Sequence, residues 1–65
     1  MKIEVKKIHI FLAEQKMTQL ALAKKCGISR QNLSTIIRRG TCTAETAGKL
    51  AVGMGIPVSE LIKET

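Results

Sequence analysis

Two short apolar patterns, separated by only a few residues, constrain the fold of this chain most. Leu22, Ala23 and Cys26 mark the buried face of one predicted helix, and Leu33 and Ile36 mark that of the next. About three residues connect the two helices, which is too few for an antiparallel pair, so we expect a steep crossing. A steep crossing needs a small residue where the helices touch and a residue that tolerates positive φ in the turn.

The residues at this junction meet both needs. Ala23 is small enough to admit the second helix, and Gly27 can adopt the left-handed conformation that ends the first. Ser29 is a suitable N-cap for the second helix, which then opens with the tripeptide Arg30-Gln31-Asn32. Three long polar side chains in a first helical turn contribute little to a core. We therefore expect them to reach a partner outside the domain.

The rest of the chain also favours helices. Apolar residues spaced by three and four predict a helix over residues 3–15, although the alternation in residues 1–6 also permits a short strand. We favour the helix because no partner strand is evident elsewhere. Capping residues and glycines then predict four more helices, over residues 18–25, 29–39, 43–55 and 57–63. The predicted fold is all-α, a compact five-helix domain formed by residues 1–65.

Composition excludes several classes of function. The chain has 65 residues and a net charge of +6, which favours a polyanionic partner and leaves little room for a deep substrate pocket. It contains no Asp, Tyr or Trp and only one histidine, His9, so paired-carboxylate, triad and metal-water chemistry lack their parts. Cys26 and Cys42 match no metal-ligand spacing, and we expect a core residue and a reduced loop thiol. We expect no enzymatic activity, no cofactor and no metal.

The N-terminal sequence has no apolar run of the kind found in signal peptides, and no stretch approaches the roughly 20 apolar residues of a membrane span. These patterns predict a cytoplasmic protein with no membrane partner. A basic first helix that lies on a membrane is a weaker alternative, because the core needs its apolar face. An RNA ligand is disfavoured because the single Phe leaves almost no aromatic surface for stacking bases.

The junction and its surroundings resemble the phage-repressor and Cro-type (XRE-like) helix-turn-helix family of transcription regulators. The resemblance extends to AVGMGIPVSELI at residues 51–62, which looks like the family's usual Gly-Ile/Val step and short closing helix. The chain departs from many members in having Ile37-Arg38-Arg39-Gly40 after the recognition helix and no proline in the loop that follows. The matching motif residues are Gln19, Leu22, Ala23, Cys26, Gly27, Ile28, Leu33 and Ile36.

The resemblance implies that the third helix reads the major groove of double-stranded DNA while the second crosses the phosphate backbone. Arg30 suits guanine, Gln31 or Asn32 suits adenine, and Thr35 suits a thymine methyl group or a phosphate. Gln19 begins a helix and can bond a phosphate. The remaining expected DNA contacts are Ser29, Ser34, Arg38, Arg39 and Thr41.

The resemblance also implies a transcriptional repressor that binds a palindromic operator as a homodimer, at least on DNA. The closing helix carries more apolar residues than one small core needs, and these predict the dimer interface: Ile56, Val58, Leu61 and Ile62. The alternative is a protein-interaction or antitoxin-like regulatory module that uses the same fold.

Overall fold

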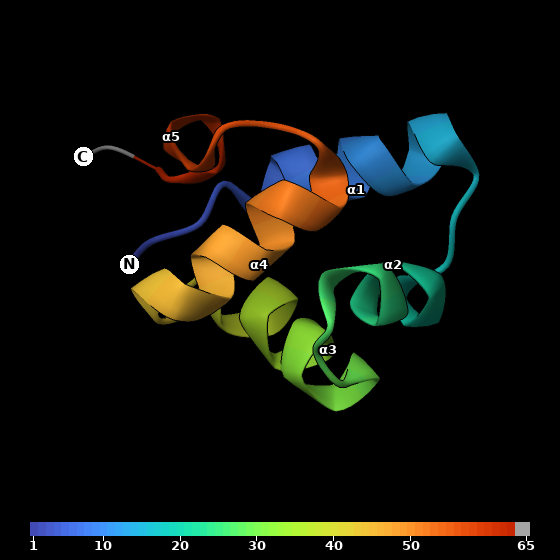
Figure 1. The fold of residues 1–65 in the computed structure, drawn as a ribbon, viewed down its shortest axis with the longest axis horizontal. Helices are drawn as coiled ribbons and strands as arrows, with labels where there is room; N and C mark the ends of the chain where they lie inside the picture. Colours follow the sequence, from blue (N-terminus) through green and yellow to red (C-terminus); the bar gives the residue numbers. More distant parts are fainter. Residues whose placement is uncertain (64–65) are drawn as a thin grey trace.

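A computed structural model describes residues 1–63, and these form five helices and no named strand. The helices are α1 (Val5–Gln15), α2 (Gln19–Cys26), α3 (Arg30–Arg39), α4 (Ala44–Met54) and α5 (Val58–Leu61) (Figure 1). The all-α prediction is confirmed. The bounds of α2, α3 and α4 agree with the expected ones to within about a residue, which is the usual uncertainty of a helix end.

Hydroxyl side chains cap three of the helices as their sequence positions predict. The Oγ1 atom of Thr18 accepts a hydrogen bond from the backbone N–H of Ala21 at 3.1 Å. Ser29 at the start of α3 and Thr43 at the start of α4 accept equivalent bonds, at 3.0 and 3.3 Å. Each bond satisfies a backbone donor that has no partner inside its helix. Residues close in sequence thus determine where α2, α3 and α4 begin.

The core lies around α4, which packs against both α2 and α5, while α2 also packs against α3. Gly53 is essential to this arrangement, because a Cβ atom at this position would overlap the Cys26 sulfur and lie 3.2 Å from the Cys26 Cα. The backbones of α2 and α4 therefore approach closely here. The buried apolar residues are Ile3, Ile8, Leu22, Ala23, Cys26, Leu33, Ile36, Ala47, Leu50, Ala51, Met54 and Leu61.

The first four residues correct the prediction of a helix from residue 3. They lie outside the helix, and Lys2 and Ile3 form isolated antiparallel bridges with Thr41 and Ile62 respectively. The N–H of Ile3 donates to the Gly40 carbonyl at 2.8 Å, and the N–H of Lys63 donates to the Lys2 carbonyl at 2.9 Å. Tertiary contacts thus satisfy these backbone groups, and a helix is not needed. We call residues 1–4 the N-terminal strap.

The closing helix is also shorter than predicted. Pro57 is its N-cap, and Ile62 has extended backbone with φ of −80° and ψ of 135°. The chain leaves the helix there because it pairs with the strap: the N–H of Glu4 donates to the Leu61 carbonyl at 2.8 Å. The strap therefore replaces the start of the first predicted helix, and the extended segment after Leu61 replaces the end of the last one. The prediction for residues 64 and 65, as a frayed end, lies outside the described residues.

Both cysteines are free thiols within the described part of the chain. Cys26 is buried between α2 and α4, which confirms its prediction as a small core residue. Burial raises the pKa of its thiol, and the nearby charge of Lys25 opposes that rise. Cys42 is half-buried in the loop between α3 and α4, where burial likewise raises its thiol pKa.

Candidate nucleic-acid interface

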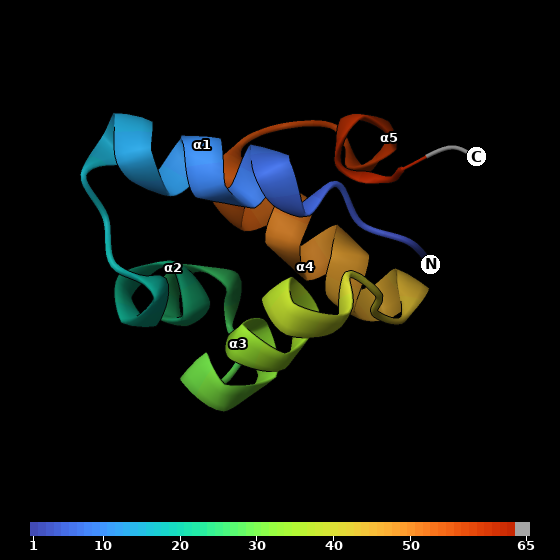
Figure 2. The same ribbon diagram turned by 180° about the vertical axis from the view of Figure 1, so that it is seen from behind.

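Helices α2 and α3 pack against each other across the short glycine turn that the sequence predicts. Ala23 is fully buried, and the chain turns at Gly27, whose φ is 75°. The N–H of Ile28 then donates to the Ala23 carbonyl at 3.0 Å, which closes the end of α2. In Figures 1 and 2, α3 forms the lower edge of the molecule, whereas α1 and α5 form the upper edge. One face of α3 is consequently open to a large partner.

The open face of α3 carries a shallow hollow of about 310 Å³. Arg30 and Arg38 lie at its two ends along the helix, and Gln31, Ser34 and Thr35 complete its lining. All except the half-buried Thr35 are exposed. The Thr35 hydroxyl donates to the Gln31 carbonyl at 2.9 Å, so this hydroxyl can still accept a hydrogen bond. The structure thus brings five of the predicted contact residues onto one surface.

The charge of this surface is positive throughout. Helix α3 contains three arginines and no carboxylate. Within residues 1–63 the only ion pair joins Lys49 to Glu45, at 3.8 Å. None of the three guanidinium groups is therefore neutralised by a carboxylate of the described chain. Such a surface attracts phosphates and leaves the guanidinium donors available for bidentate hydrogen bonds.

Two polar residues at the helix starts are placed differently from the rest. The Ser29 oxygen is used as the cap of α3, which leaves its hydroxyl hydrogen to donate elsewhere. Gln19 is the first residue of α2 and is half-buried. Its position at a helix N-terminus suits an anion, because the backbone N–H groups there point outward.

A second hollow lies beside α3, and its far wall was not predicted. Asn32, Thr35 and Arg39 line one side of this hollow of about 470 Å³, while Thr43 and Thr46 from the start of α4 line the other. The Thr43 hydroxyl donates to the Thr46 hydroxyl at 3.0 Å. Thr43 caps α4, so the signal in the sequence was the N-terminus of this helix, which suits an anion.

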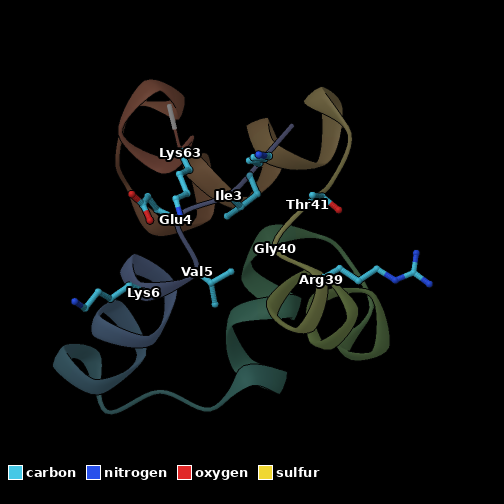
Figure 3. A pocket seen from close by; sticks show the side chains of 9 residues that line it. Ile3, Glu4, Val5, Lys6, Arg39, Gly40, Thr41 and Lys63 are labelled. Carbon is cyan, nitrogen blue, oxygen red and sulfur yellow. The ribbon is translucent and has the colours of Figure 1, made fainter. Parts of the chain in front are cut away.

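Arg39 and Thr41 lie past the exposed face of α3, at the edge of another hollow. This one, about 560 Å³ in volume, is bounded on its other side by the strap and the start of α1. Figure 3 shows the Arg39 side chain on one side and those of Lys6 and Lys63 on the other. The two residues, predicted as contacts to the DNA backbone, therefore lie between α3 and a second basic region. We call this hollow the strap groove.

The prediction of the dimer interface is wrong for Leu61. Its side chain is 0% exposed and belongs to the core, because the bridge between the strap and residue 62 folds α5 inward. Ile56 and Ile62 are half-buried, and Ile56 packs against the core. Val58, at 40% exposed, is the most accessible of the four. Most of the apolar side chains of the closing segment thus pack within the monomer.

The glycine turn between α2 and α3, the capped start of α3 and the exposed polar face of α3 define a helix-turn-helix domain. The helix-turn-helix family model HTH_3 matches residues 8–61, so the chain belongs to this Cro/C1-type, XRE-like family of DNA-binding regulators. The predicted family is confirmed. No curated protein and no solved structure matches the chain significantly. None of the described helices is long and apolar enough to cross a membrane.

Proposed function

We propose that this protein is a transcriptional repressor that binds double-stranded DNA sequence-specifically, with α3 in the major groove. The observation that carries the proposal is the open face of α3, where two arginines and the amide of Gln31 line one hollow without a carboxylate. A helix with its side chains is about 10–12 Å across, and the major groove is about 12 Å wide. The ten residues of α3 can therefore enter it for about 15 Å.

Within this face, the start of the helix and its end have different roles. Arg30 and Gln31 lie in the first turn, which reaches base edges most deeply, and their groups suit guanine and adenine respectively. Arg38 and Arg39 lie in the last turn, where the chain returns to the sugar-phosphate backbone. Gln19 holds a phosphate on the other side of the groove. The two sets supply specificity and affinity, respectively.

One domain covers about half a turn of DNA, so the repressor binds as a two-fold dimer to half-sites about 34 Å apart. Val58 is the residue proposed for this contact, because it is an exposed apolar residue on α5 that follows half-buried Ile56 by two positions. The contact is small, so DNA stabilises the dimer by holding two copies together.

The test combines selection and point variants. Duplexes selected from a random library should share a palindromic sequence, and Arg30→Ala or Gln31→Ala should lose about 1–3 kcal/mol on that sequence but much less on random duplex. Arg38→Ala should weaken both duplexes equally and lower the slope of log affinity against log salt by about one unit. If Arg30→Ala and Gln31→Ala lost the same affinity on both duplexes, the proposal that α3 recognises bases would be wrong.

The alternative role, a protein-interaction module, is supported by a different surface. A hollow of about 310 Å³ between α1, the end of α4 and α5 has four apolar lining residues, Ile10, Phe11, Met54 and Ile56, and three charged ones, Lys7, Glu14 and Glu60. An apolar patch with charged residues around it can accept a side chain from another protein. Absence of duplex binding at low salt would favour this function over the first.

A further inference from the structure

The strap groove gathers an unusual share of the positive charge of the molecule. Four of its nine lining residues are cationic, and a single carboxylate, Glu4, accompanies them. The cations are Lys2, Lys6, Arg39 and Lys63. They come from three parts of the chain that are distant in sequence. Their convergence is a product of the tertiary structure.

The scaffold of this groove is held by backbone hydrogen bonds. The strap lies between the loop after α3 and the segment after α5, and it is bonded to both. Cys42 donates to the Met1 carbonyl at 3.0 Å on one side, and Lys63 donates to the Lys2 carbonyl at 2.9 Å on the other. The side chains of Lys2 and Lys63 are exposed, so they project from a fixed base. A fixed base reduces the entropy lost when they bind a partner.

The floor of the groove has little to offer a small polar ligand. Ile3, Val5 and Gly40 lie between the charged walls, as Figure 3 shows. The Ile3 N–H and the Gly40 carbonyl bond to each other. Recognition must therefore come from the flexible cationic side chains at the rim, which act as point charges. This chemistry suits an extended polyanion whose charges are spaced along a chain.

The groove is also continuous with the surface that holds DNA. Thr35 lines both the hollow on the face of α3 and the hollow beside it, and Arg39 and Thr41 line both the second hollow and the strap groove. A polyanion that leaves the end of α3 past Arg39 meets the lysines of the strap groove next. The DNA bound by α3 can therefore itself supply the phosphates for this groove.

We infer that the strap groove binds the phosphodiester backbone of the DNA flanking the half-site, with Lys2 and Lys63 as its main contacts. The inference rests on the proposed function and extends it: the N-terminal strap and the chain after α5 become part of the DNA-binding surface. Glu4 limits the groove to partners with several phosphates, because a single anion gains less from the lysines beside a carboxylate.

The test measures the binding of a random-sequence duplex of about 30 base pairs over a salt series. The variant carries Lys2→Gln and Lys63→Gln. The matched control carries Lys7→Gln and Lys25→Gln, which remove the same charge from lysines that are engaged elsewhere: Lys7 donates to the Glu60 carbonyl at 2.6 Å, and the Lys25 nitrogen lies 5.9 Å from the centre of the Phe11 ring. Circular dichroism melts check that both variants keep the fold.

Each lost phosphate contact lowers the salt slope by about 0.9, so the groove variant should lose nearly two units while the control loses well under one. If the parent binds the duplex and the two variants have the same slope, the strap groove is not a DNA contact and the proposed function stands. If the parent does not bind any duplex, the proposed function itself fails.

A small free phosphate compound is the other possible ligand of the strap groove. Pyrophosphate is the probe for that source, with amide NMR shifts at residues 2, 39, 41 and 63 as the readout. Shifts saturating at micromolar pyrophosphate, together with an unchanged duplex salt slope in the groove variant, would overturn the inference in favour of a small-anion site. Absence of such shifts, with the loss of slope, supports the flanking backbone.

Discussion

Gly53 gives the sharpest test of the packing, because helix propensity and tertiary contact predict opposite results for Gly53→Ala. In a helix interior Ala is more favourable than Gly by up to about 1 kcal/mol. At Gly53, however, the new Cβ would overlap the Cys26 sulfur and lie 3.2 Å from the Cys26 Cα. Overpacking of this kind costs about 1–3 kcal/mol. We expect a net loss of about 1–2 kcal/mol in the free energy of unfolding.

Gly48 provides the control on the same helix. A Cβ at Gly48 meets no atom within 4 Å, so Gly48→Ala should show only the gain, about 0.4–1 kcal/mol. Urea denaturation followed by circular dichroism measures both, and in a domain of this size 1 kcal/mol moves the melting temperature by about 4–8 °C. The two variants should therefore shift the melt in opposite directions.

A second substitution locates the contact. In a Cys26→Ala background the sulfur is absent, so Gly53→Ala should cost at least about 1 kcal/mol less than in the parent, which is the coupling expected of two touching residues. The cost should not vanish, because the Cys26 Cα remains close. If Gly53→Ala stabilised the parent as Gly48→Ala does, the close approach of α2 and α4 would be refuted.

Further predictions concern the core, the turn and the interface. Leu61→Lys should unfold the monomer, because its side chain is fully buried; a folded circular dichroism spectrum would contradict its place in the core. Val58→Lys should keep the fold and weaken self-association in sedimentation with DNA, and an unchanged dimer would exclude α5 from the interface. Gly27→Val places a β-branched residue at a φ of 75° and should lower thermal stability and duplex binding together; an unchanged melt would contradict the turn. Burial raises the pKa of the Cys26 thiol above its unfolded value, so its contribution to stability is present below about pH 8.5 and is lost as the pH rises through the folded pKa. Urea titrations of the parent and Cys26→Ala should therefore diverge above pH 8.5, and parallel curves would contradict this.

The helix-turn-helix unit could be predicted because its determinants are local. The Ser29 cap, the Gly27 turn and the small Ala23 each act within a few residues of the chain, and all three are found where the sequence places them. The exposed polar face of α3 follows from the same pattern, since burying Leu33 and Ile36 leaves Arg30 and its neighbours outside. Their contacts with bases stay predictions.

The parts that could not be predicted depend on partners far away in sequence. The helix predicted from the spacing of Val5, Ile8 and Phe11 was extended back to residue 3. The true partners of the strap are single residues, which leave no strand pattern of their own. Leu61 likewise looks like surface surplus until the strap covers it. Glycine at position 53 is unfavourable for a helix by itself, and only the close approach of Cys26 explains it.

The sequence by itself thus determined the helices, the turn and the polar face of α3, because caps, glycines and apolar spacing act over one or two helical turns. Only the tertiary structure decided that Leu61 is interior and where the lysines of the strap groove converge. Both depend on long-range backbone hydrogen bonds: Lys2 and Lys63 are brought together by the bond between the Lys63 N–H and the Lys2 carbonyl. No periodic pattern in the sequence predicts that pairing.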